Sequence, residues 1–129
     1  MRLRHWGRVL KPASPGPSLI VCSTCRDPGG ATGGGAALLK ALRALETTIA
    51  VDKMACLWSC GAGASVQLRA PGKIGYVMGG FAAADARDIL AFAAAYAATA
   101  DGEVPFDLWP KGVLGHFIAR IPPPGMLIA

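Results

Sequence analysis

The spacing of hydrophobic residues predicts an alternation of short strands and helices. Runs that are β-branched, or that alternate apolar with polar positions, indicate strands at residues 18–22, 47–51, 65–69 and 74–78. Apolar residues at helical spacing indicate helices at residues 36–45, 84–100 and 111–119. Ala70-Pro71-Gly72-Lys73 joins the last two strands, and its proline and glycine favour a tight hairpin turn.

The order of these elements predicts an α/β fold. It reads β-α-β-β-β-α, followed by a short C-terminal helix. The first two strands should pair in parallel, because a helix connects them as a crossover. The hairpin should then add an antiparallel edge, which makes the sheet mixed. A strand, a helix and a strand, followed by a hairpin and a covering helix, form a thioredoxin-like arrangement.

One domain is expected, over residues 18–124. A chain of 129 residues has the usual length of a single domain. Residues 1–17 are expected to be a flexible basic lead-in, because their three prolines interrupt regular structure. Residues 125–129 are interpreted as a C-terminal tail.

The net charge of +5 is concentrated near the N-terminus. Four basic residues lie in the first eleven positions, and the remainder has nine basic against eight acidic side chains. A nucleic-acid binder carries its basic residues on a folded face, so we do not expect nucleic-acid binding. No apolar stretch reaches the roughly 18 residues that span a membrane, and no apolar signal segment follows the first charges. A cytoplasmic location is therefore expected, where thiols stay reduced.

The four cysteines form two close pairs. Cys22 and Cys25 are two residues apart as C-x₂-C, and Cys56 and Cys60 form C-x₃-C. Each pair comes directly after one of the first two predicted strands. If those strands are parallel neighbours, both pairs lie at the same end of the sheet. Four thiolates within a few ångströms would ligate a tetrahedral metal ion or an iron–sulfur cluster, so the sequence predicts one metal centre.

Other uses of these thiols stay open. Two disulfides are disfavoured by a reducing compartment. A dithiol redox site at Cys22 and Cys25 would sit after the first strand, as in thiol–disulfide oxidoreductases. Against this use, the next predicted helix begins about ten residues later, too far along the chain to lower a thiol pKa by its N-terminus. A Cys₄ zinc site is a further alternative.

Several short segments together resemble a known bacterial family. They are CSTCRDP, CLWSCGAG, the hairpin AxGKxGYVxGG, DG…P…WP and the terminal IxRxPP, over about residues 19–124. These segments are similar to those of predicted metal-binding, thioredoxin-like [2Fe-2S] ferredoxin-like proteins. The resemblance implies a thioredoxin-like ferredoxin fold and a [2Fe-2S] cluster bound by Cys22, Cys25, Cys56 and Cys60. It also implies an electron carrier or redox sensor linked to cobalamin biosynthesis, because family members are often encoded beside cobalamin genes.

One spacing departs from the ferredoxins that this layout resembles. The C-x₃-C pair matches thioredoxin-like ferredoxins and the small cluster subunit of respiratory complex I, whereas C-x₂-C is tighter than their C-x₄-C. A tight pair also suits zinc, so a zinc or cobalt-handling module is the alternative. Because no general base beside a substrate pocket is evident, we expect a non-enzymatic protein with a separate redox partner, and a homodimer is compatible with the sequence. Trp58 is expected to shield the site or to pack in the core, and His116 to be a core or surface residue.

Overall fold

The computed structural model describes residues 3–5, 8–10, 15–58 and 60–127; for residues 3–5, 8–10 and 60 it describes the backbone alone. The strands are β1 (Leu3–His5), β2 (Arg8–Leu10), β3 (Ser18–Cys22), β4 (Ala50–Met54), β5 (Val66–Arg69), β6 (Gly75–Met78) and β7 (Phe117–Ile121). The α-helices are α1 (Gly34–Arg43) and α2 (Ala86–Ala97). Single 3₁₀ turns lie at η1 (Cys60–Ala62), η2 (Ala83–Asp85), η3 (Phe106–Leu108) and η4 (Lys111–Val113).

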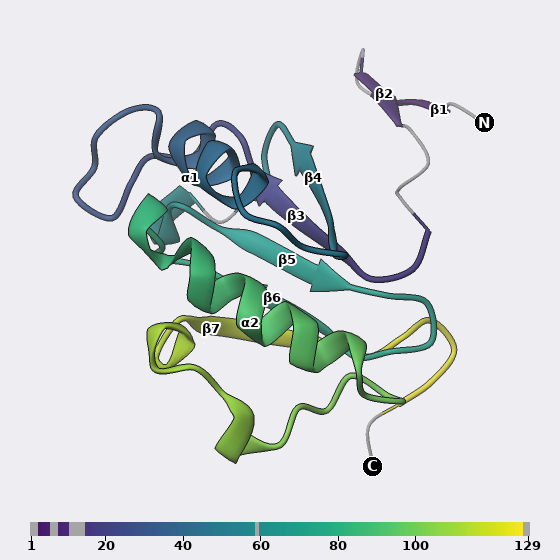
Figure 1. The fold of residues 1–129 in the computed structure, drawn as a ribbon. Coiled ribbons are helices and arrows are strands. Elements are labelled where there is room, and N and C mark those ends of the chain that lie inside the picture. Colours follow the sequence, from purple (N-terminus) through teal and green to yellow (C-terminus); the bar gives the residue numbers. More distant parts are fainter. Residues whose placement is uncertain (1–2, 6–7, 11–14, 59, 128–129) are drawn as a thin grey trace.

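Five strands form one mixed sheet, in the order β4-β3-β5-β6-β7. β3 and β4 pair in parallel, and α1 connects them as the crossover. The other neighbours pair antiparallel. Figure 1 shows α1 and α2 side by side on one face of the sheet. The predicted α/β class, the parallel pair and the hairpin are therefore confirmed.

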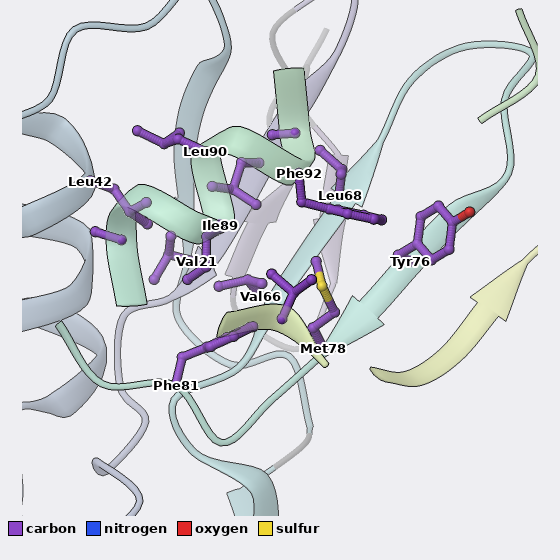
Figure 2. Close-up of a cluster of buried hydrophobic side chains, with 14 of the residues drawn as sticks. Val21, Leu42, Val66, Leu68, Tyr76, Met78, Phe81, Ile89, Leu90 and Phe92 are labelled. Carbon is purple, nitrogen blue, oxygen red and sulfur yellow. The ribbon is translucent and has the colours of Figure 1, made fainter. Parts of the chain in front are cut away.

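The core lies between the sheet and the two helices. Alternate residues of the three central strands point to the same face, because successive side chains of a strand point to opposite sides. These inward residues are fully or almost fully buried, and Figure 2 shows part of the cluster they form with α1 and α2. The strand members are Leu19, Val21, Val66, Leu68, Tyr76 and Met78, and the helix members include Leu38, Leu42, Ile89, Phe92 and Tyr96. Each large side chain contributes about 1.5–3 kcal/mol by this burial.

The C-terminal helix predicted at residues 111–119 is wrong. Only the single turn η4 forms, and Gly115 then adopts a left-handed φ of 79°. Phe117–Ile121 continues as β7, which pairs with the open side of β6. The ring of Phe117 packs against Tyr76, Phe92 and Trp109, so this end of the chain gains both backbone pairing and aromatic contacts. The hairpin is therefore interior to the sheet, and β7 is the edge strand.

Smaller differences concern the boundaries and the lead-in. β4 is shifted toward the C-terminus from its predicted range of 47–51. Within the predicted lead-in, β1 and β2 form a separate two-stranded antiparallel ladder that precedes the three prolines, and the flexibility of the lead-in stays a prediction. Residues 11–14 lie outside the described residues. In the described part of the chain, no helix combines the length and the apolar character that crossing a bilayer requires.

Candidate metal centre

The first cysteine pair lies at the carboxyl end of β3. Cys22 is the last residue of β3 and is opposite Met54, the last residue of β4. The parallel pairing therefore brings the chain that leads to Cys56 to the same end of the sheet, as the sequence predicted. Cys22 and Cys25 are 1% and 4% exposed. Both thiols are thus shielded from bulk water by the loops around them.

Hydrogen bonds tie the loop of the first pair to the chain that leads to the second. The Ser23 N–H donates to the Met54 carbonyl oxygen at 2.9 Å, and the Ser23 hydroxyl donates to the same oxygen at 3.3 Å. The Thr24 hydroxyl donates to the Ala55 carbonyl oxygen. The cysteine loops are therefore neighbours before any metal is considered.

The chain that follows the second pair also returns to the first. η1 begins at Cys60, and Gly63 then packs so closely on Arg26 that a Cβ there would lie 2.3 Å from the Arg26 carbonyl oxygen. The Cys22 N–H donates to the Ser65 carbonyl oxygen at 3.0 Å. Because segments on both sides of residues 56–62 contact the Cys22–Cys25 turn, the second cysteine loop is held over the first.

Helix α1 begins directly against the first pair. The Gly35 N–H donates to the Cys25 carbonyl oxygen at 2.9 Å, and a Cβ on Gly35 would lie 2.0 Å from the Cys22 carbonyl oxygen. The residues between Cys25 and α1 thus fold back and return the helix N-terminus to the cysteine turn. The ten or so residues between Cys25 and the predicted helix had instead suggested that the helix N-terminus lies far from the thiols. Gly35 is required for close backbone approach rather than for donating to sulfur.

The two buried thiols have different acidities. Burial raises the pKa of Cys22, but hydrogen bonds from the Cys25 thiol, the Leu57 N–H and Thr24 outweigh it and lower the pKa to about 7. Burial raises the pKa of Cys25, and its hydrogen bond to Cys22 raises it further, while Ser65 opposes the change. The sulfur of Cys22 is therefore the thiolate that forms first, and thiolates are the form that binds metals.

The structure brings two of the four candidate ligands together. Cys22 and Cys25 lie in one buried turn, and each thiol shifts the pKa of the other. Cys56 is half-buried, and its sulfur accepts the Trp58 N–H at 3.3 Å. Among the side chains that the structure describes, no three His, Cys, Asp or Glu residues gather closely enough to hold a metal ion. The side chain of Cys60 lies outside the described residues, so the four-cysteine site stays a prediction.

Other residues near the site differ from their sequence-based expectations. Trp58 is 91% exposed and has a left-handed φ of 64°, so the expectation that it shields the site or packs in the core is wrong. His116 has a structural role: its Nδ1 lies 2.8 Å from the Gly79 carbonyl oxygen, and its ring stacks on Phe81. The sequence analysis did not identify Ser65 and Thr24 as residues that contact the cysteines. Thr24 could have been noticed because it lies between Cys22 and Cys25, whereas the sequence carries no signal for Ser65.

The mixed sheet with both helices on one face is a thioredoxin-like fold, with Cys22 and Cys25 buried at one end of the sheet. Residues 19–123 match the family described as "Protein of unknown function (DUF1636)", and the chain belongs to that family. Its fold is similar to that of a thioredoxin-like [2Fe-2S] ferredoxin from Aquifex aeolicus, with a TM-score of 0.51 and 19% sequence identity, covering 88% of this chain and 100% of the ferredoxin. No curated protein gives a significant match. The predicted thioredoxin-like ferredoxin fold is thereby confirmed, whereas neither comparison mentions cobalamin.

Proposed function

We propose that this chain holds a [2Fe-2S] cluster through Cys22, Cys25, Cys56 and Cys60, and that it carries electrons or senses redox state. One observation carries the proposal: hydrogen bonds from residues 23 and 24 to the carbonyl oxygens of residues 54 and 55 hold the first cysteine turn against the chain that leads to Cys56. The similar fold of a [2Fe-2S] ferredoxin supports it.

The donor set suits such a cluster. Thiolates are the usual ligands of [2Fe-2S] clusters, and one close pair for each iron is the simplest assignment. When bound, the cluster would supply one-electron transfer. The chain's own contribution is to exclude water from Cys22 and Cys25 and to direct the Trp58 N–H at the Cys56 sulfur. Hydrogen bonds to sulfur and low solvent exposure both tune the potential of a cluster.

The observations favour this function over a dithiol oxidoreductase. The lowered pKa of Cys22 and the return of the α1 N-terminus to the cysteine turn suit either function. A disulfide substrate, however, must reach the attacking sulfur, and both residues are almost fully buried. A Cys₄ zinc or cobalt-handling site uses the same ligands and stays the alternative. In either metal-bound form the protein would work with a redox or metal-exchange partner rather than as a catalyst on its own.

Metal analysis of single cysteine variants tests the proposal. Anaerobically purified chain should be brown and contain about two irons and two acid-labile sulfides per chain. Each Cys→Ser variant should lose most of its iron. Ser18→Ala is the matched control, because it removes a buried hydroxyl that donates to Asp52 at 2.7 Å, at the opposite end of β3 from Cys22. One zinc without sulfide would establish the alternative. Full iron content in the Cys56→Ser and Cys60→Ser variants would refute the four-cysteine site.

Disulfide reductase activity separates the dithiol function from both metal sites. The Cys56→Ser/Cys60→Ser double variant keeps the thiols of Cys22 and Cys25. We expect this variant to have no such activity in an insulin reduction assay. Turnover equal to that of a thioredoxin would support the oxidoreductase and count against the electron carrier.

A further inference from the structure

We propose that the hydroxyl of Ser65 donates a hydrogen bond to the Cys25 sulfur and thereby raises the reduction potential of the bound cluster. This inference rests on the proposed function, and it assigns a positioning role to a residue outside both cysteine loops.

Ser65 is a buried polar residue whose side chain reaches the site. It is 0% exposed, and its Oγ lies 3.5 Å from the Sγ of Cys25. A buried hydroxyl without a partner costs about 1–3 kcal/mol, so buried hydroxyls are normally hydrogen-bonded. The contact with Cys25 satisfies the Ser65 hydroxyl within the described part of the chain. The contact between Ser65 and Cys25 is therefore part of the buried interior and is not an exposed surface contact.

The backbone around Ser65 fixes the hydroxyl in place. The Ser65 carbonyl oxygen accepts the Cys22 N–H, so this residue contacts both members of the first pair. The preceding residue, Ala64, exchanges two hydrogen bonds with Phe81, each of 3.2 Å. β5 begins directly afterwards, at Val66. The hydroxyl is thus carried by the rigid end of a central strand, which can hold a fixed geometry toward sulfur.

The direction of the hydrogen bond follows from the chemistry of a bound thiolate. A cysteine that ligates a metal has no S–H proton, so the Ser65 O–H must donate and the sulfur must accept. A second hydroxyl, that of Thr24, lies 3.8 Å from the Cys22 sulfur, but it already donates its proton to the Ala55 carbonyl oxygen. Among the hydroxyls that the structure describes near Cys22 and Cys25, Ser65 is therefore the one that can donate to sulfur.

A donated hydrogen bond changes the electronics of the cluster. Reduction adds negative charge, part of which resides on the ligating sulfurs. A donor directed at sulfur stabilises that charge more strongly in the reduced state than in the oxidised state, and this raises the potential. Removing the donor should lower the potential. A purely structural serine would affect folding or cluster content without a directed shift in potential.

The test measures midpoint potentials of the full chain, purified anaerobically with its cluster. Ser65→Ala should have a more negative potential than wild type, Ser65→Thr should restore it because the hydroxyl is retained, and Ser18→Ala should leave it unchanged. Equal potentials for Ser65→Ala and Ser18→Ala would overturn the inference. Resonance Raman spectra give a second readout, because amide donors to sulfur are common to wild type and Ser65→Ala. Iron–sulfur stretching bands should move more in wild type than in Ser65→Ala when the proteins are transferred to D₂O, and equal movement would also overturn the inference.

The same variants separate this inference from the proposed function. If the wild type contains no iron and sulfide, the proposed function is wrong, and Co²⁺ added to the apo chain becomes the probe. The sulfur-to-cobalt charge-transfer band should then lie at lower energy in Ser65→Ala than in wild type or Ser18→Ala, because a thiolate without its donor gives up charge more easily. An unchanged band would refute the role of Ser65. A chain that binds neither iron nor cobalt refutes both proposals.

Discussion

Gly35→Ala tests whether helix α1 must touch the cysteine turn. A Cβ at position 35 would lie 2.0 Å from the Cys22 carbonyl oxygen, 3.1 Å from its carbonyl carbon and 3.2 Å from the Cys25 nitrogen. Carbon and oxygen atoms normally stay at least about 3.3 Å apart, so the turn or the helix must move by roughly 1 Å. The obstructing atoms belong to the backbone, which cannot rotate away as a flexible side chain could.

The expected loss of stability is about 3 kcal/mol. Overpacking a close contact costs about 1–3 kcal/mol, and the upper end applies because the approach is so short. The hydrogen bond from the Gly35 N–H to Cys25 would be lost, at about 1 kcal/mol. Alanine gains about 1 kcal/mol over glycine inside a helix, which offsets that hydrogen bond. The displaced turn should also lose its metal-binding geometry, so iron content should fall.

Urea unfolding of the apo chain and iron analysis of the loaded chain measure the two effects. Gly61→Ala is the matched control, because Gly61 directly follows Cys60 yet a Cβ there meets nothing within 4 Å. Gly61→Ala should keep its iron and change the free energy of unfolding by less than about 1 kcal/mol. If Gly35→Ala unfolds at the same urea concentration as wild type and binds as much iron, the packing argument for the site is wrong.

Four further perturbations test other parts of the structure. Tyr76→Phe should lower the free energy of unfolding by about 1 kcal/mol, because its hydroxyl donates to a backbone carbonyl at 2.8 Å, whereas Tyr96→Phe should leave it unchanged or raise it, because its buried hydroxyl has no partner among the described residues. Burial raises the pKa of Tyr96 to about 12, above its value of about 10 in the unfolded chain. The free energy of unfolding of wild type should therefore be unaffected by this group below about pH 10 and should fall between pH 10 and 12, whereas Tyr96→Phe should lack this part of the fall. Urea midpoints that fall as steeply in Tyr96→Phe as in wild type would contradict this. Trp58→Ala should change thermal stability little, because the side chain is 91% exposed. Trp58→Gly should be more stable than Trp58→Ala by about 1 kcal/mol, because glycine adopts the left-handed φ of this position without strain. Equal melting temperatures for Trp58→Gly and Trp58→Ala would argue against that backbone conformation. Metal removal should increase hydrogen exchange in residues 26–35 and 61–64 while α2 stays protected, and equal loss of protection in α2 would show that the fold itself depends on the metal.

The sequence was most informative where a short β-branched run forms a strand that is buried throughout. The run at residues 18–22 predicted β3 with its observed bounds, and the helix between two strands predicted the parallel pairing of β3 with β4. These features depend on local pattern and on the handedness of crossovers, both of which a single sequence carries. The position of Cys22 at the end of β3 follows directly.

Prediction failed where long-range contacts decide the local structure. Residues 111–119 fit a short helix by their apolar spacing, but the open side of β6 and the aromatic cluster around Phe117 make Phe117–Ile121 a strand. Gly112 and Gly115 within that range were the available warning, since glycine is unfavourable inside a helix. β4 was shifted because register with β3, rather than composition, sets its bounds.

The candidate site also has some features that are local in sequence and others that depend on long-range contacts. Cysteine spacing supplied the candidate ligand set, because the pairs themselves are local in sequence. The contacts of Ser65 and Thr24 depend on strand register and on the return of the chain after Cys60, which spacing does not encode. The role of Gly35 was hidden for the same reason: the loop between Cys25 and α1 brings it back to the cysteine turn.

Iron and acid-labile sulfide analysis of the anaerobically purified full chain tests the central claim most directly. A four-cysteine [2Fe-2S] centre predicts about two irons and two sulfides per chain, together with visible absorbance that disappears in each Cys→Ser variant. Zinc without sulfide, or a colourless protein that cannot be reconstituted with iron and sulfide, would contradict it.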